Sequence, residues 1–173
     1  MKNIKNKLAD YAKDIKLNLS TVLTEDGAPD LTQKQITMTA LASAFASKNR
    51  ELIDALLADN QEQLSTVEIN GVKAAATIMA MNNIFYRFLH LTTDKSYSSL
   101  PAKLRMNVMA SPGIEKIDFE LCSLAVSAIN GCGMCIDSHT QMLEKVGVSK
   151  LGIQSAIRIA SVIHAASFAL ELN

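Results

Sequence analysis

The feature that most constrains the fold of this chain is a series of apolar segments at helical spacing, each preceded by a residue that caps a helix. The stretches 32–35 and 65–68 both have the form of a capping box, in which a hydroxyl and a side-chain carbonyl satisfy the first free backbone donors. Asn49 and Ser149 precede two further apolar segments in the same way. No segment of about four to eight residues alternates between apolar and polar side chains as a half-buried strand does. The sequence therefore predicts an all-α fold.

The expected helices divide the chain into two parts. They span about residues 3–23, 32–46, 50–58, 65–88, 116–129, 133–146 and 150–172. A break or cap is expected inside the fourth of them, at Asn70-Gly71, because glycine weakens a helix. The polar, proline-bearing segment 92–113 joins the parts. A chain of 173 residues is long enough for one core, so we expect a single domain over 1–173, with halves at about 1–91 and 114–173.

The two halves share a weak internal similarity at an offset of 83 residues. This offset places Leu41-Ala42 opposite Leu124-Ala125 and Ile53-Asp54 opposite Ile136-Asp137. It also pairs Asn49 with Cys132, Leu52 with Cys135, and Leu56 with His139. We interpret the chain as one helical unit used twice around a shared core, with the chemistry kept only in the second copy.

Composition excludes several classes of function. Seventeen basic and seventeen acidic side chains balance, so nucleic acid is not an expected partner. The amino-terminal stretch lacks the apolar core of a signal peptide, and the most apolar segments are interrupted well short of the roughly 20 residues of a membrane span. We therefore expect a soluble cytoplasmic protein with no membrane partner. Its three cysteines do not suggest a disulfide scaffold, and Cys122, in an apolar helical stretch, is expected to be buried.

The decapeptide 130–139, Asn-Gly-Cys-Gly-Met-Cys-Ile-Asp-Ser-His, carries the most informative chemistry. It places Cys132 three residues before Cys135, and His139 lies four residues further on, on the same helical face as Cys135. A thiolate is the nucleophilic form of cysteine, and a helix N-terminus or a nearby imidazolium lowers the thiol pKa below about 8.5. The Asn130-Gly131 turn would leave both thiols at the start of a helix.

Three interpretations of this pattern remain open from the residues alone. Cys132, Cys135 and His139 could hold zinc if Glu120 or His164 completed the site, although the chain has no second Cys-x-x-Cys. The cysteines could also pack passively in the core. In the third interpretation the pair exchanges between dithiol and disulfide: Cys132 resolves, and His139 takes the proton from Cys135. This last hypothesis defines a class of function and names no substrate.

Residues 118–139 resemble the active-site segment of the alkyl hydroperoxidase D (AhpD) family, within the carboxymuconolactone decarboxylase-like superfamily. The segments 81–90 and 104–113 are similar to that family as well. The resemblance implies an AhpD-like helical fold and a catalytic set of Glu120, Cys132, Cys135 and His139. Cys135 would be the attacking thiol, able to pass through a sulfenic acid, and Cys132 would be the resolving thiol and a proton donor. Some members carry a histidine where this chain has Met134, so the proton relay here would depend on His139, Glu120 or water.

The resemblance also implies an activity and partners. The chain would reduce the disulfide of an AhpC-type peroxiredoxin, would be re-reduced by a dihydrolipoyl group on a 2-oxoacid dehydrogenase complex, and would have weak peroxidase activity of its own. It implies no haem, flavin or metal, only the redox-active Cys132-Cys135 pair, and it implies a homotrimer or a multiple of one. The alternatives are a decarboxylase-like lyase of the superfamily and a thiol-based stress sensor. We expect four methionines to serve packing or an interface: Met79, Met81, Met106 and Met109.

Overall fold

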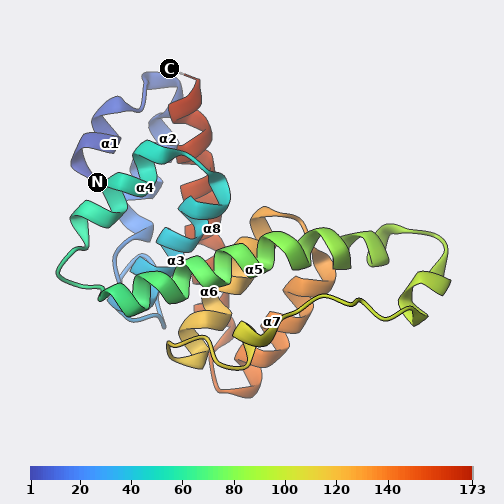
Figure 1. The fold of residues 1–173 in the computed structure, drawn as a ribbon. Helices are drawn as coiled ribbons and strands as arrows, with labels where there is room; N and C mark the ends of the chain where they lie inside the picture. The colour runs from blue at the N-terminus through green and yellow to red at the C-terminus, as the bar shows by residue number, and fades with distance from the viewer. Residues whose placement is uncertain (173) are drawn as a thin grey trace.

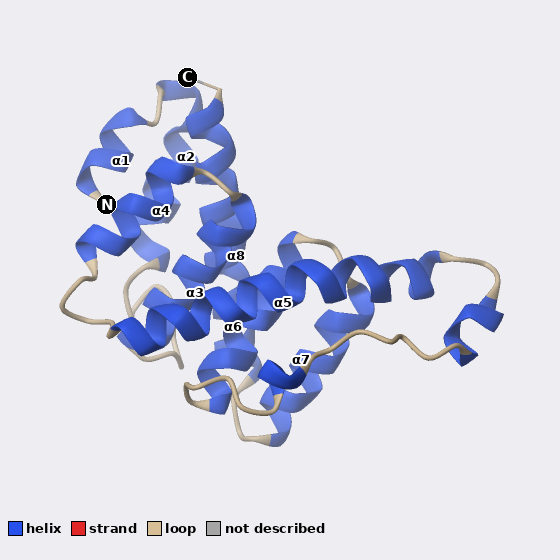
Figure 2. Ribbon diagram, viewed as in Figure 1, coloured by secondary structure: helices blue, strands red, loops and turns tan. Residues whose placement is uncertain are grey.

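The structure, a computed structural model, describes residues 1–172 and is built from helices (Figure 1). Within these residues it contains no strand, so the all-α prediction is confirmed (Figure 2). The α-helices are α1 (Lys2–Lys7), α2 (Lys13–Val22), α3 (Gln33–Ser47), α4 (Arg50–Asp59), α5 (Thr66–Leu91), α6 (Lys116–Ile129), α7 (Gly133–Lys145) and α8 (Lys150–Glu171). Short 3-10 helices lie at η1 (Asp10–Ala12), η2 (Lys95–Ser99) and η3 (Asn107–Met109).

Three helices, α3, α6 and α8, pack against one another and form the centre of the core. Each contributes side chains that are shielded from solvent, such as Leu41 of α3, Phe119 of α6 and Ile159 of α8. Helix α5 covers α3 and α6, and α7 packs on α5 and α6. Figure 1 shows α5 continuing beyond this core as a projecting arm, from which the chain returns through residues 92–113. The buried side chains of α6 thus fix the position of the helix that leads directly into the two-cysteine segment.

The capping residues stand where the sequence placed them. Thr32 Oγ1 accepts the N–H of Gln35 at 3.3 Å, and the Gln35 side chain accepts the N–H of Thr32 at 3.0 Å. Ser65 and Glu68 form the second reciprocal box at the start of α5. Because these bonds satisfy donors within the first turn, the starts of these helices are determined locally.

The amino-terminal helix is shorter than expected. The sequence predicts one helix over 3–23, but the backbone is extended at Leu8 and Ala9, and η1 separates α1 from α2. The break allows α1 to pack on α4, where the terminal ammonium pairs with Asp59, while α2 packs on α8. A straight helix would reach only one of these surfaces.

Helix α5 continues through Asn70-Gly71, so the expected break there is wrong. Gly71 is buried, and a Cβ added to it would lie 2.5 Å from Cγ2 of Ile114. The glycine therefore permits the close approach of the segment that leads into α6, and it does not end the helix.

The helices recur at the offset seen in the sequence. The first residues of α6 and α7 lie 83 positions after those of α3 and α4, and the first residue of α8 lies 84 positions after that of α5. Asn49 caps α4, and Cys132 occupies the same position before α7.

Helix α8 is long and apolar enough to cross a membrane by length and composition, in contrast to the expectation that no segment would be. Half of its most apolar window is buried inside the protein. Because α8 packs against α2, α3 and α6, the core accounts for its apolar character.

Candidate active site

The turn between α6 and α7 positions the two cysteines. Asn130 ends α6, and Gly131 has φ +68°, a left-handed conformation that glycine adopts without strain. The chain then reverses so that the N–H of Cys132 donates to the carbonyl of Ser127 at 3.1 Å. Cys132 is the N-cap of α7, and its Sγ accepts the N–H of Cys135 at 3.3 Å. The sulfur of Cys132 therefore lies at the positive end of the α7 dipole, where an anion is favoured.

Cys132 and Cys135 are joined by a disulfide, with their Cα atoms 5.3 Å apart. Cys132 is fully buried, whereas Cys135 keeps an exposed fraction of 6%. Of the two sulfur-bearing residues, Cys135 is thus the one that an incoming molecule reaches. Free thiolates at this helix start would be stabilised by the backbone N–H groups of its first turn.

Beneath the pair, Glu120 of α6 and His139 of α7 form a buried hydrogen bond between Oε2 and Nδ1, 2.6 Å long. The other carboxylate oxygen of Glu120 lies 3.2 Å from Nζ of Lys116. Burial raises the pKa of Glu120, but the hydrogen bonds and charges of His139 and Lys116 outweigh it and hold this pKa below its ordinary value. Glu120 is therefore an anion at neutral pH, and it fixes the orientation of the imidazole.

The second ring nitrogen of His139, Nε2, contacts Sδ of Met79 at 3.2 Å. Among the described residues, neither ring nitrogen is hydrogen bonded to a sulfur of the disulfide. The sequence predicts a direct contact from His139 to Cys135 across one helical turn, and the bridged form does not show it. A thioether is a weak acceptor, so Nε2 is the ring atom most easily redirected toward another partner.

A cleft of about 550 Å³ opens onto Cys135 and His139. Its wall is mostly apolar, and four methionine side chains supply much of it: Met79, Met106, Met109 and Met134. Asn82, Tyr86 and Ser138 contribute polar atoms. Unbranched thioether side chains adapt to irregular apolar partners, so this cleft suits a flexible apolar chain that must reach the Cys135 sulfur.

Other residues considered from the sequence lie elsewhere. His164 is exposed on α8 and bonds to Ser47, so it is not available to complete a zinc site with the cysteines. Within residues 1–172 no three metal-binding side chains lie together in a way that could hold a metal ion. Cys122 is fully buried, as expected, and burial raises the pKa of its thiol well above the ordinary value.

Two members of the site were missed by sequence reasoning. Lys116 lies four residues before Glu120, a spacing that places the two side chains on one helical face and could have identified the ion pair. Met79 contacts His139 from 60 positions away in the chain. No local pattern signals such a contact, and packing was the natural interpretation of this methionine.

Comparison with known proteins shows the family of this chain. Residues 97–172 match the Carboxymuconolactone decarboxylase family, a span that contains all four candidate residues. The chain is 54% identical over 164 residues to "Alkyl hydroperoxide reductase AhpD" of Coxiella burnetii (strain Dugway 5J108-111), covering 95% of this chain and 93% of that protein. It is 48% identical over 169 residues to the protein of the same name from Brucella abortus (strain 2308), covering 98% and 95%. The chain belongs to the AhpD family.

The resemblance stated from the sequence is thereby confirmed, as is the helical fold it implied.

Proposed function

We propose that this chain is an antioxidant dithiol-disulfide oxidoreductase of the alkyl hydroperoxide reductase AhpD type. The observation that carries the proposal is the Cys132-Cys135 bridge at the start of α7, open to a cleft at Cys135 and supported from within by the Glu120-His139 pair. The names of the relatives support the same class of activity.

The reduced pair would transfer two electrons to the disulfide of an AhpC-type peroxiredoxin. The Cys135 thiolate attacks one sulfur of that disulfide, forming a mixed disulfide and releasing the first partner thiolate. The Cys132 thiolate then attacks Cys135, which breaks the mixed disulfide, releases the second partner thiolate and closes the Cys132-Cys135 bridge. Overall the enzyme dithiol is oxidised and the partner disulfide is reduced, and the two protons that leave the enzyme thiols end on the partner.

Glu120 and His139 would manage these protons. With Nδ1 held by the carboxylate, the imidazole can carry a proton on Nε2, which faces the same cleft as Cys135. When the bridge is open, movement of Nε2 from the Met79 thioether to the sulfur of Cys135 would let His139 accept the thiol proton. Water in the cleft is the alternative carrier, because Met134 has no ionisable group.

A dihydrolipoyl group would restore the dithiol. One of its thiolates attacks the Cys132-Cys135 bridge, and its second thiol then closes the lipoyl ring, so the two electrons pass from the lipoyl group to the enzyme. The group is a dithiol on a flexible apolar arm, which the methionine-lined cleft can accommodate. Such a partner, carried on a 2-oxoacid dehydrogenase complex, is consistent with a cytoplasmic enzyme.

Weak direct peroxidase activity follows from the same thiols. The Cys135 thiolate would attack the terminal oxygen of an alkyl hydroperoxide, giving an alcohol and a sulfenic acid at Cys135. Cys132 would displace the hydroxyl as water and close the bridge. Residues 132 and 135 thus account for both reactions with no further cofactor.

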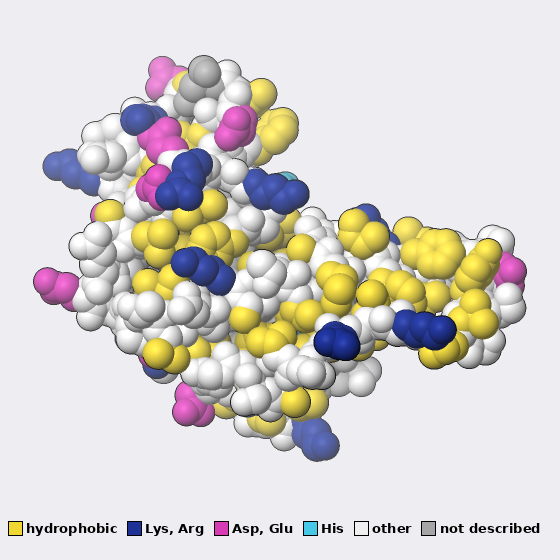
Figure 3. Space-filling model, viewed as in Figure 1, with side chains coloured by type: hydrophobic (Ala, Val, Ile, Leu, Met, Phe, Trp, Pro, Cys, Tyr) yellow, Lys and Arg dark blue, Asp and Glu magenta, His cyan; other side chains and the backbone are white. Residues whose placement is uncertain are grey.

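The projecting arm supports self-association into the trimer that the resemblance implies. Figure 3 shows hydrophobic side chains gathered over this arm. Several are largely exposed on the isolated chain: Ile84, Phe88, Leu91, Tyr97 and Leu100. We propose that a second copy of the chain covers them, because contiguous exposed apolar surface marks an interaction site.

Steady-state turnover with defined substrates tests the proposal. Wild-type protein should couple oxidation of dihydrolipoamide to reduction of an AhpC-type disulfide, and Cys135→Ser should abolish this coupling. In Cys132→Ser the mixed disulfide at Cys135 should accumulate and be visible on a non-reducing gel. Cys122→Ser, which changes the buried third cysteine, is the matched control and should turn over normally.

The same assay separates the alternatives. A decarboxylase-like lyase would not oxidise dihydrolipoamide, and its activity would survive Cys135→Ser. A thiol-based sensor would oxidise once and would not turn over. Absence of multiple turnovers in the wild-type protein would refute the enzyme proposed here.

A further inference from the structure

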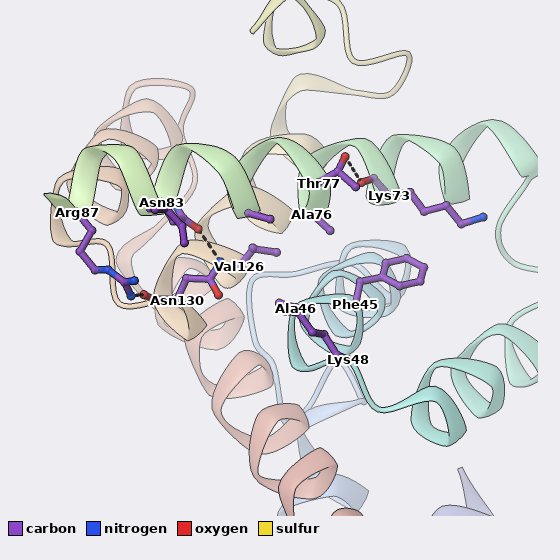
Figure 4. Close-up of a pocket in the computed structure, with 12 residues that line it drawn as sticks. Phe45, Ala46, Lys48, Lys73, Ala76, Thr77, Asn83, Arg87, Val126 and Asn130 are labelled. Atoms are coloured by element: carbon purple, nitrogen blue, oxygen red, sulfur yellow. Dashed lines mark hydrogen bonds between the residues drawn. The ribbon is translucent and has the colours of Figure 1, made fainter. Parts of the chain in front are cut away.

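A hydrogen-bonded clamp from α5 holds the turn before Cys132 (Figure 4). Nη1 of Arg87 donates to the main-chain carbonyl of Asn130 at 2.5 Å. Nδ2 of Asn130 donates to Oδ1 of Asn83 at 2.9 Å, and Nδ2 of Asn83 donates to Oγ of Ser127 at 2.9 Å. The side chains of Arg87 and Asn83 on α5 therefore bind both the end of α6 and the turn that follows it.

The clamp connects directly to the cysteines. Asn130 is two residues before Cys132, and the N–H of Cys132 is bonded to the carbonyl of Ser127. Ser127 thus receives a bond from the clamp through its side chain and a bond from Cys132 through its backbone. A displacement of this turn relative to α5 would move the start of α7 and the sulfur that caps it.

Packing alone does not explain the arginine. Arg87 lines a cavity of about 430 Å³ together with Lys48 and Lys73, and Figure 4 shows its side chain bending toward the Asn130 carbonyl. Arg87 therefore borders open space, and its guanidinium bonds to the Asn130 carbonyl. Asn83, in contrast, is fully buried and has both ends of its amide bonded.

We infer that Arg87 and Asn83 are positioning residues that set the thiol-disulfide equilibrium of Cys132 and Cys135. This inference rests on the proposed redox function. By fixing the Asn130-Gly131 turn, they limit how far the two sulfurs separate once the bridge opens. A clamped dithiol loses less conformational freedom on closing the bridge than an unclamped one. The clamp therefore favours the disulfide form.

Loss of the clamp should shift the equilibrium between disulfide and dithiol toward the dithiol. Without the clamp, the open dithiol gains conformers that the bridge forbids, so reduction becomes more favourable. We expect the equilibrium constant for reduction by dithiothreitol to rise about three- to tenfold in Arg87→Met, and a tenfold change corresponds to about 30 mV for a two-electron couple. In that equilibrium dithiothreitol loses two electrons and two protons and closes to its cyclic disulfide, while the Cys132-Cys135 bridge opens to two thiols.

The test is a redox titration of the full chain in dithiothreitol buffers, with the reduced fraction read by thiol alkylation and mass. Arg87→Met keeps an unbranched, flexible stem and removes the guanidinium donor. Arg158→Met is the control, because among residues 1–172 that arginine bonds within α8, to Ser155. Asn83→Asp is the second variant: it keeps the acceptor for Asn130 and removes the donor to Ser127, so it should shift the equilibrium in the same direction.

The outcomes distinguish this inference from the proposed function. If the wild-type bridge does not titrate at all, the redox function fails, and the clamp fails with it. If the wild type titrates and folded Arg87→Met has the same equilibrium constant, only the clamp is refuted. A purely structural role would lower the melting temperature of Arg87→Met and leave the equilibrium constant unchanged. If Asn83→Asp does not fold, the equilibrium constant of Arg87→Met alone tests the clamp.

Discussion

Replacement of Glu120 by glutamine tests the proton-handling part of the site most directly. The substitution keeps the shape of the side chain and removes the charge that faces Nδ1 of His139 at 2.6 Å. A hydrogen bond to a charged group contributes about 1.5–3 kcal/mol, and a neutral one about 1 kcal/mol. The difference, about 0.5–2 kcal/mol, corresponds to a fall of roughly 2- to 30-fold in turnover if this hydrogen bond to a charged carboxylate is needed in the transition state.

The hydrogen bond between Glu120 and His139 also contributes to the stability of the fold, and this contribution depends on pH. The pKa of Glu120 is lowered in the folded protein, so its stabilising effect is fully present above the ordinary value of 4.5 and is lost as the pH falls through the lower folded value. At pH 7 the Glu120→Gln variant should melt roughly 1–8 °C below the wild type. The gap should narrow as the pH falls below 4.5.

The assay combines steady-state turnover with dihydrolipoamide and thermal melts from pH 3 to 8. Glu144→Gln, an exposed position on α7, is the matched control for loss of one carboxylate and should change neither quantity. Turnover of Glu120→Gln within about twofold of wild type, with the protein folded, would remove Glu120 from the relay. A melting-point gap that stays constant in acid would show that its ionised form does not stabilise the fold.

Four further predictions follow from particular contacts. Gly71→Ala should destabilise the protein by about 1–2 kcal/mol because the new methyl group meets Ile114, and a stabilised variant would contradict this. Glu68→Gln should destabilise the protein at neutral pH, and the difference should shrink progressively as the pH falls from 4.5 toward 2, because hydrogen bonds from Lys34 and Ser65 lower the pKa of Glu68 to about 2. Met79→Leu should lower turnover by removing the sulfur that contacts Nε2 of His139, whereas Met106→Leu, in the same cleft, should not. Alkylation of reduced native protein should label Cys135, and Cys122 only after unfolding.

The sequence allowed prediction of features that depend on neighbouring residues. The capping boxes at 32–35 and 65–68 begin helices where expected, because the bonds that start a helix lie within one turn. The Cys-x-x-Cys segment and its histidine also lie close together in the sequence, so their resemblance to a family could be recognised from a short segment. Glu120 entered the catalytic set through that resemblance alone, since an isolated helix carboxylate carries no signal of its contact with His139.

Features that depend on distant contacts were not predictable in this way. Whether a helix breaks at Leu8 or continues at Gly71 depends on what packs there: α4 and α8 determine the first, and Ile114 the second. The Met79 contact with His139 and the Arg87 contact with Asn130 join α5 to segments more than 40 residues away. Helical periodicity identifies the buried face of α5, but it does not identify the partner of each side chain on that face.

The related positions of Asn49 and Cys132 suggest why the chemistry lies at the start of α7. Asn49 Oδ1 caps α4 by accepting the N–H of Leu52 at 2.9 Å, and Cys132 Sγ accepts the N–H of Cys135 at 3.3 Å in the same way. Sulfur in a disulfide or a thiol is a weak acceptor, whereas a thiolate is a charged one at a site where the helix dipole favours an anion. Reduction followed by ionisation therefore converts a weak helix cap into a strong one. The backbone geometry that begins α7 thus stabilises the form of Cys132 that resolves the mixed disulfide, without any additional cationic side chain.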